Sequence, residues 1–280
     1  MTRTETLGRK VWNAAVLLVL GAAAVFTLFP IYMALLNSFK SDGEMLSRVL
    51  ALPTALDFGN YADAYRKIDY VNSLVNTIVV TGIGVVGIVL FASMAGYKMS
   101  RTPGKLSSFL FGLFVLSSLI PFHSIVISLV KISNELRVQG TTYGLGLIYV
   151  GLGVALAIFL YHGFVKSVPR ELDEAAVIDG CGELRLFFAI ILPLLLPITA
   201  TVAILNALWM WNDFLLPLLM LTDNDYYTLL ISTNMLFGEY NNDWSAILAS
   251  LILTMLPVVA VYLLLQKYIL RGIAEGAIKG

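Results

Sequence analysis

The sequence predicts an all-α membrane protein with six transmembrane helices and a cytoplasmic loop between the fourth and the fifth. Of the 280 residues, 59% are hydrophobic and only 13% are charged, and the mean hydropathy is +0.85. Soluble domains contain about 45–50% apolar and about 25% charged residues. The apolar residues are also gathered in long blocks, and the basic residues are unevenly divided between the connecting segments.

Six apolar blocks are long enough to cross a bilayer, which takes about 20 residues at a rise of about 1.5 Å each. The blocks are residues 11–36, 71–97, 106–130, 143–165, 192–221 and 244–268. A segment in lipid must satisfy its own backbone hydrogen bonds, so we expect helices; barrel strands would show alternating segments of about ten residues. We expect one membrane domain over residues 1–280.

The first block could be mistaken for a signal peptide, because Arg3, Arg9 and Lys10 precede an apolar run that contains three consecutive alanines. The run continues as far as Leu36, which is too long for the apolar region of a signal peptide. We therefore expect an uncleaved first transmembrane helix.

The basic residues predict the orientation. An even number of spans places both termini on one side, together with segments 98–105 and 166–191. That side carries twelve of the 18 Lys and Arg residues, and the side with segments 39–70 and 222–243 carries the remaining six. Cytoplasmic segments are enriched in Lys and Arg. We expect a multi-pass protein of a bacterial or archaeal cell (inner) membrane with both termini in the cytoplasm.

The 166–191 loop has the pattern of a short helix, a glycine bend and a second helix. Pro169 suits a first helical turn, where its missing N–H costs nothing. Acidic residues that suit the positive end of the helix dipole follow it: Glu171, Asp173 and Glu174. Gly180 and Gly182 can adopt positive φ and end the helix. Ala175 and Ala176 leave a surface of low relief, so the element could fit a groove on a partner.

The same loop resembles a known motif. Glu174-Ala175-Ala176, Asp179-Gly180 and Ile191-Leu192-Pro193-Leu194, followed by Pro197, are similar to the EAA motif of ABC importer permeases. Further matches span nearly the whole chain: Asn76-Thr77, Gly96-Tyr97 before Arg101, Trp211-Asn212-Asp213-Phe214, Gly272, Gly276-Ala277 and Lys279-Gly280. Together they resemble the carbohydrate-uptake branch, and in it the shorter, maltose-type second permease. The chain departs from the family pattern at Cys181-Gly182, where other small residues are common.

The resemblance implies that the motif forms coupling helices that dock on ATPase subunits. The residues to which it assigns this contact are Glu171, Glu174, Ala175, Ala176, Asp179, Gly180 and Gly182. It also implies a second, homologous permease, two ATPase subunits, an extracytoplasmic sugar-binding protein and membrane lipid as partners. We expect no nucleic-acid partner.

We expect a transport subunit that is not an enzyme and binds no cofactor. The chain has no Gly-x-x-x-x-Gly-Lys phosphate-binding loop, so ATP and Mg²⁺ would bind to the partner ATPases. It has one cysteine, Cys181, and its two histidines lie in different apolar blocks, which argues against a metal site. The expected function is import of a sugar or oligosaccharide by alternating access. The alternatives are an ABC importer for another small solute and an ion-coupled secondary transporter.

Polar residues in the fifth block are costly in lipid, so they face either a transport pathway or another helix. For Asn206 we favour a helix contact; for Trp211, Asn212 and Asp213 both interpretations stay open. The C-terminal tail has two interpretations as well. It could be frayed, or, as the resemblance implies, it reaches the ATPases through Gly276, Lys279 and Gly280.

Overall fold

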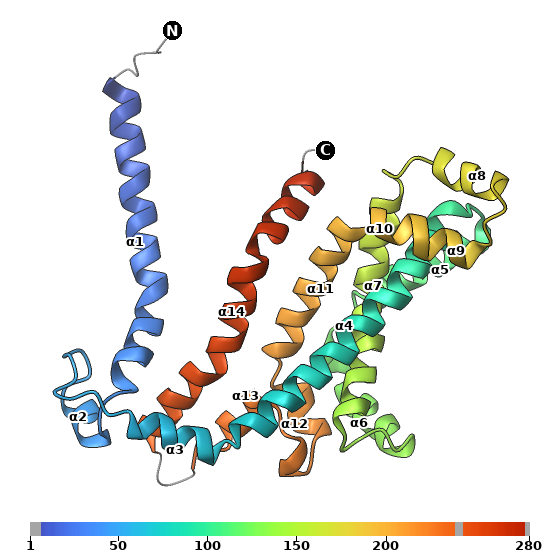
Figure 1. Cartoon of the computed structure of the whole chain (residues 1–280). Helices are drawn as coiled ribbons and strands as arrows, with labels where there is room; N and C mark the ends of the chain where they lie inside the picture. The colour runs from blue at the N-terminus through green and yellow to red at the C-terminus, as the bar shows by residue number, and fades with distance from the viewer. Residues whose placement is uncertain (1–6, 239–242, 278–280) are drawn as a thin grey trace. The chain divides into compact units, whose positions relative to one another are not determined.

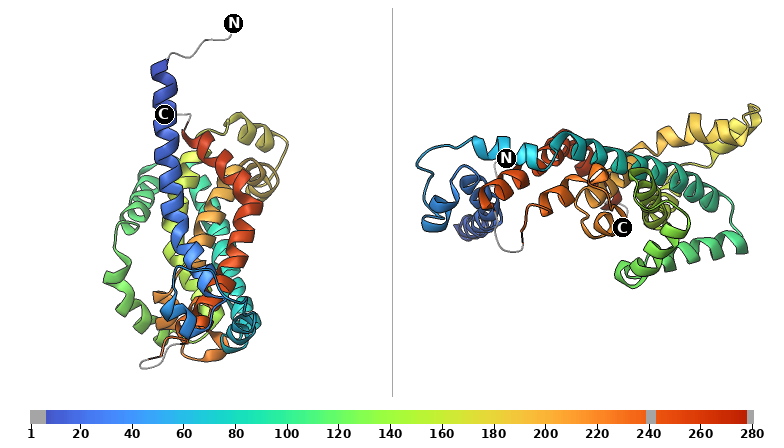
Figure 2. Two further views of the ribbon diagram at one scale, coloured as in Figure 1. Left: turned by 90° about the vertical axis from the view of Figure 1, so that its left-hand side faces the viewer. Right: turned by 90° about the horizontal axis from the view of Figure 1, so that it is seen from below.

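The computed structural model describes residues 7–238 and 243–277, and the regular structure in these residues is entirely helical (Figures 1 and 2). The predicted all-α class is therefore confirmed. The helices are α1 (Leu7–Asn37), α2 (Asp42–Ser47), α3 (Gly59–Lys67), α4 (Tyr70–Arg101), α5 (Lys105–Ser117), α6 (Phe122–Glu135), α7 (Thr142–Val165), α8 (Glu171–Ile178), α9 (Glu183–Leu186), α10 (Leu192–Leu194), α11 (Leu196–Trp211), α12 (Leu215–Met220), α13 (Leu229–Asn234) and α14 (Trp244–Ala277). A π-helical turn covers Phe187–Ile191, and a 3₁₀ turn covers Asn224–Tyr226.

Four of the six predicted spans are single helices long and apolar enough to cross a membrane. They are Val11–Asn37, Tyr70–Arg101, Thr142–Val165 and Trp244–Leu263. Each agrees with its predicted block to within a few residues, because a long apolar run between charged segments leaves little choice of boundary.

The other two predicted spans are broken, which the hydropathy of the sequence does not reveal. The block at 106–130 contains α5 and α6, which meet at 100°. Pro121, whose backbone is extended, directly precedes the first residue of α6. The block at 192–221 begins with α10, the last turn of a helical segment (Glu183–Leu194) that starts before the block and meets α11 at 78°. Helix α11 ends at Trp211 rather than at residue 221. By length and composition, the described residues therefore contain four candidate spans, or up to six when each bent pair counts as one.

The chain forms two compact units. One comprises residues 1–68 and 235–255, and the other residues 69–234 and 256–280. The last of the three boundaries, between residues 255 and 256, falls inside α14, so the units are not consecutive sequence domains. The single membrane domain stays a prediction.

In the smaller unit, a buried lysine organises the segment that follows α1. Lys40 is fully buried, and its Nζ donates to Asn37 Oδ1 at 2.9 Å, to the Arg48 carbonyl at 2.9 Å and to the Val49 carbonyl at 3.1 Å. Three acceptors use all three hydrogens of the ammonium group, which is what a buried charge requires. The predicted outer connection is thus folded rather than irregular.

In the larger unit, α4 and α7 lie side by side along most of their length (Figure 1). Small residues allow the two backbones to approach closely, as in other membrane helix pairs. A Cβ atom added to Gly96 would lie 2.7 Å from Cβ of Tyr161 and 3.0 Å from the backbone nitrogen of His162. The pair is therefore closely packed, and the 166–191 loop follows directly after α7.

Candidate functional site

The 166–191 loop folds as the predicted helix, bend and helix. Helix α8 ends in a Schellman motif: Gly180 has φ of 77°, its N–H donates to the Val177 carbonyl at 3.0 Å, and the Cys181 N–H donates to the Ala176 carbonyl at 2.9 Å. Two predictions need correction. Gly182 has φ of −70° and needs no glycine, and Pro169 lies two residues before α8 rather than in its first turn.

The residues expected to dock on a partner do not all lie on the surface. Glu171, Glu174, Ala175, Asp179, Gly180 and Gly182 are exposed. Ala176 is only 4% exposed and packs in the core, so it supports α8 from within instead of adding to its free surface. Three large apolar side chains that the sequence did not single out are exposed on α8 as well: Leu172 at 39%, Val177 at 62% and Ile178 at 85%.

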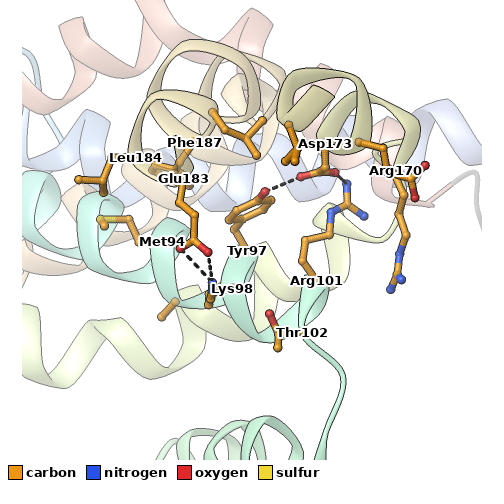
Figure 3. A pocket seen from close by; sticks show the side chains of 14 residues that line it. Met94, Tyr97, Lys98, Arg101, Thr102, Arg170, Asp173, Glu183, Leu184 and Phe187 are labelled. Carbon is orange, nitrogen blue, oxygen red and sulfur yellow. Dashed lines mark hydrogen bonds and ion pairs between the residues drawn. The ribbon is translucent and has the colours of Figure 1, made fainter. Parts of the chain in front are cut away.

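Among the acidic residues of α8, Asp173 is the one that contacts the end of α4. The sequence marked it only as a residue of the first helical turn. Its Oδ2 lies 2.9 Å from Nη2 of Arg101, and its Oδ1 accepts a hydrogen bond from the Tyr97 hydroxyl (Figure 3). Nη2 of Arg101 also donates to the Val168 carbonyl at 2.9 Å. The Arg101 and Asp173 side chains are 12% and 16% exposed. We call Tyr97, Arg101 and Asp173 the joint cluster.

One sequence signal could have pointed to this cluster. Tyr97 and Arg101 are four residues apart on a helix, so they share a face, and both were noted as part of the family resemblance. Their acidic partner lies 76 residues beyond Tyr97 in the chain, and helical periodicity carries no information about a contact at that range.

A second ion pair joins the same end of α4 to α9. Nζ of Lys98 lies 2.9 Å from Oε1 and 3.0 Å from Oε2 of Glu183. The two side chains are 59% and 84% exposed, so water screens the pair strongly and its contribution is small. The joint cluster, in contrast, is largely shielded from water.

An open cavity of about 570 Å³ lies between the end of α4 and helices α8 and α9 (Figure 3). Met94, Leu186 and Phe187 provide apolar lining, and charged side chains of both signs complete it. The Tyr97 ring packs against the Phe187 ring with their centroids 5.6 Å apart. The arrangement suits a contact that positions helices rather than a catalytic centre, because four of its charged side chains form two ion pairs across the cavity, Lys98 with Glu183 and Arg101 with Asp173.

The polar residues of the predicted fifth span bond mostly within their own segment. Asn206 and Asn212 donate to the carbonyls four residues before them, at 2.8 and 2.7 Å. Asp213 accepts from the Tyr149 hydroxyl of α7 at 2.8 Å and from the Leu215 N–H at 3.1 Å. Of the two interpretations left open for Asp213, the bond from Tyr149 agrees with a contact between helices. The pathway interpretation stays a prediction.

Trp211 and the tail residues lie elsewhere. Trp211 lines an apolar cavity of about 360 Å³ bordered by α4, α11 and α14, and its indole nitrogen is buried with no hydrogen-bond partner among the described residues. Gly276 lies within α14, while Lys279 and Gly280 lie outside the described residues. Contact of the tail with an ATPase stays a prediction.

These features define the class of protein as a helical membrane protein. The fold matches that of a bacterial ABC transporter involved in the import of the acidic polysaccharide alginate, with a TM-score of 0.84 and 21% sequence identity over 95% of this chain and 99% of the other. Residues 88–275 match the family described as the binding-protein-dependent transport system inner membrane component. The chain therefore belongs to this family of ABC transporter permeases, and the resemblance inferred from its motifs is confirmed.

Curated relatives cover nearly the whole chain. The permease AmyC of Thermoanaerobacterium thermosulfurigenes, assigned to transport of starch degradation products, is 38% identical over 89% of this chain and 91% of its own length. The melibiose/raffinose/stachyose import permease MelC of Bacillus subtilis is 34% identical over 90% and 91%. The multiple sugar-binding transport system permease MsmG of Streptococcus mutans is 35% identical over 94% and 95%. These relatives are transport subunits, and a membrane component without enzymatic activity is consistent with them.

Proposed function

We propose that this chain is a permease subunit of an ABC importer that moves a sugar or oligosaccharide into the cytoplasm by alternating access. The observation that carries the proposal is the set of relatives named for sugar transport, which are 34–38% identical over at least 89% of this chain. A second permease and an extracytoplasmic sugar-binding protein complete the importer. ATP and Mg²⁺ bind to two separate ATPase subunits.

Helix α8 is the contact that we assign to the ATPase. Its exposed surface combines the acidic Glu171 and Glu174 with Ile178, which is 85% exposed, and Val177. Exposed apolar side chains beside charged ones are a common feature of surfaces that a partner covers. The excess of basic residues in the loops supports a cytoplasmic location for this surface and for both termini.

Alternating access sets a thermodynamic condition on that contact. ATP shifts the importer between inward-facing and outward-facing states only if the ATPases interact differently with the two states. The α8 contact therefore has to transmit a displacement as well as hold the subunits together. A well-ordered helix cap at Gly180 and a fixed attachment at Asp173 both serve that requirement.

The test is uptake by the purified complex in proteoliposomes, with the sugar-binding protein supplied outside and ATP enclosed. We expect uptake of a labelled oligosaccharide that requires ATP and persists after ionophores have removed ion gradients. Uptake that follows an ion gradient without ATP would support a secondary transporter instead. ATP-dependent uptake restricted to a solute that is not a sugar would contradict the assigned substrate class and leave the ABC mechanism in place.

A further inference from the structure

We propose that the joint cluster fixes α8 to the end of α4, so that a displacement of α8 moves α4 and α7 instead of being absorbed by the loop. Tyr97 and Arg101 act in this proposal as positioning residues, because neither has to touch an ATPase or a substrate. The inference rests on the proposed function and adds to it the route by which motion enters the membrane-spanning helices.

The first support is the convergence of two contacts on one carboxylate. One oxygen of Asp173 accepts a hydrogen bond from the Tyr97 hydroxyl, and the other forms an ion pair with Arg101 Nη2 at 2.9 Å without the geometry of a hydrogen bond. The same nitrogen donates to the Val168 carbonyl, in the segment that leads into α8. One guanidinium group therefore holds both the helix and the chain that enters it, which restricts rotation of α8 about its attachment.

Burial is the second support. The side chains of Arg101 and Asp173 are 12% and 16% exposed, so removal of either partner leaves a poorly solvated charge on the other. The Lys98–Glu183 pair joins the same helix end to α9 but is 59% and 84% exposed. Water competes for that pair, and it cannot provide a comparable restraint.

The third support is the packing beyond the joint cluster. Directly before Tyr97, Gly96 lets α4 approach α7 so closely that a Cβ there would lie 2.7 Å from Cβ of Tyr161. The Tyr97 ring also packs against Phe187, which follows α9. The end of α4 is thus held between α7 on one side and the α8–α9 segment on the other. Closely packed helices shift as units, so a displacement of α8 is passed on to the pair.

The experiment compares sugar uptake and ATP hydrolysis in the reconstituted complex. The variants are Arg101→Ala, Asp173→Asn and the charge exchange Arg101→Asp with Asp173→Arg, and the matched control is Lys98→Ala with Glu183→Ala. In the two single variants we expect the ATPase subunits to co-purify at the normal ratio and sugar transported per ATP to fall by about tenfold, within the usual range of coupling between sites. We expect the charge exchange to restore at least part of that ratio and the control to stay within about twofold of it.

An unchanged ratio of sugar to ATP in Arg101→Ala and Asp173→Asn overturns the proposal, and so does an equal loss in the exposed-pair control. If Arg101→Ala prevents assembly, the ratio of sugar transported to ATP hydrolysed is measured in Arg101→Lys and Tyr97→Phe instead. Tyr97→Phe keeps the ring against Phe187 and removes only the hydroxyl, so a lowered ratio supports the cluster and an unchanged one refutes it. Failure of the proposed function is distinct, because the unaltered complex would then show no ATP-dependent sugar uptake.

Discussion

Single residues in the 166–191 loop show how local backbone chemistry builds the site. Gly180 supplies the left-handed conformation that ends α8, and the two carbonyls that would otherwise lack partners at that end are satisfied by the Schellman bonds. Gly182, two positions later, has ordinary backbone angles. The sequence predicted the bend, because a glycine after a short amphipathic run is a local signal. It could not distinguish which glycine needs positive φ.

The first prediction tests that distinction. Gly180→Ala places a side chain at φ of 77° and should weaken the cap by about 1–2 kcal/mol. Gly182→Ala is the matched control, since a Cβ at either position meets nothing within 4 Å. Hydrogen exchange of the 171–186 peptides should be faster by about fivefold or more in the first variant, because local opening follows the lost free energy. The prediction fails if both variants exchange alike.

The second prediction concerns pH at the start of α14. The Lys67 side chain, whose Nζ lies 2.5 Å from Oδ2 of Asp243, lowers the pKa of that carboxyl, and the Ala246 N–H that Asp243 accepts lowers it further. When folding lowers the pKa of a carboxyl, its ionised form stabilises the folded state. This stabilisation is fully present at pH above the pKa of the unfolded chain, about 3.9, and is lost as the pH falls through the pKa of the folded state. Because Asp243 is 45% exposed, the effect should be modest.

The measurement for Asp243 is hydrogen exchange of the first turn of α14 from neutral pH down to about pH 3, corrected for intrinsic exchange rates. Protection should decline at the acidic end in the unaltered chain. In Asp243→Asn the decline should be absent, with lower protection already at neutral pH. Equal acid sensitivity in the variant would show that another group is responsible.

At the scale of helices, the sequence was most informative where a whole span is one straight element. For α1, α4, α7 and α14, the long apolar runs predicted most of the helix ends to within a few residues. It was least informative where a span is broken, since the bends at 118–121 and at Leu195 leave hydropathy unchanged. The prolines at 121 and 197 were visible signals, but a proline in a membrane helix can also produce only a kink. The contact of Asp173 with Tyr97 and Arg101 could not be predicted for a related reason: it depends on how α4 and α8 meet.

The third prediction tests the packing of α4 on α7. Gly96→Ala adds a methyl group that would lie 2.7 Å from Cβ of Tyr161 and 3.0 Å from a backbone nitrogen, so the helices must separate. We expect a loss of about 1–3 kcal/mol, the usual cost of overpacking. Gly82→Ala on the same helix meets nothing within 4 Å and should leave stability unchanged or slightly higher. Thermal unfolding of the purified complex in detergent measures both, and a Gly96→Ala variant as stable as Gly82→Ala would contradict the close approach.

At the scale of the whole molecule, the proposed function makes this chain one subunit of a larger importer. That function requires a contact surface strong enough to hold an ATPase and an attachment stiff enough to carry motion inward. The structure separates these two demands within α8. Asp173 and Ala176 face this chain and anchor the helix, whereas Glu174 and Ile178 are exposed. Variants of the two sets should therefore fail in different ways.

The fourth prediction makes that separation measurable. Glu174→Lys and Ile178→Glu change exposed side chains, so the chain should keep its stability while the ATPase subunits no longer co-purify with it. An interface residue that carries a large share of the binding free energy costs about 2 kcal/mol or more when altered, which weakens an assembly by about 30-fold. Leu46→Glu is the matched control, because Leu46 is 73% exposed on α2, outside the α8 surface.

Full recovery of the ATPase with both α8 variants would exclude this face as the docking surface. Loss of the ATPase with Leu46→Glu as well would show that a charge on any exposed apolar residue disturbs assembly. The expected result is that only the two α8 variants lose the ATPase subunits, while Arg101→Ala keeps them but transports less sugar per ATP. That result would show that docking and transmission of motion are separate properties of one short helix.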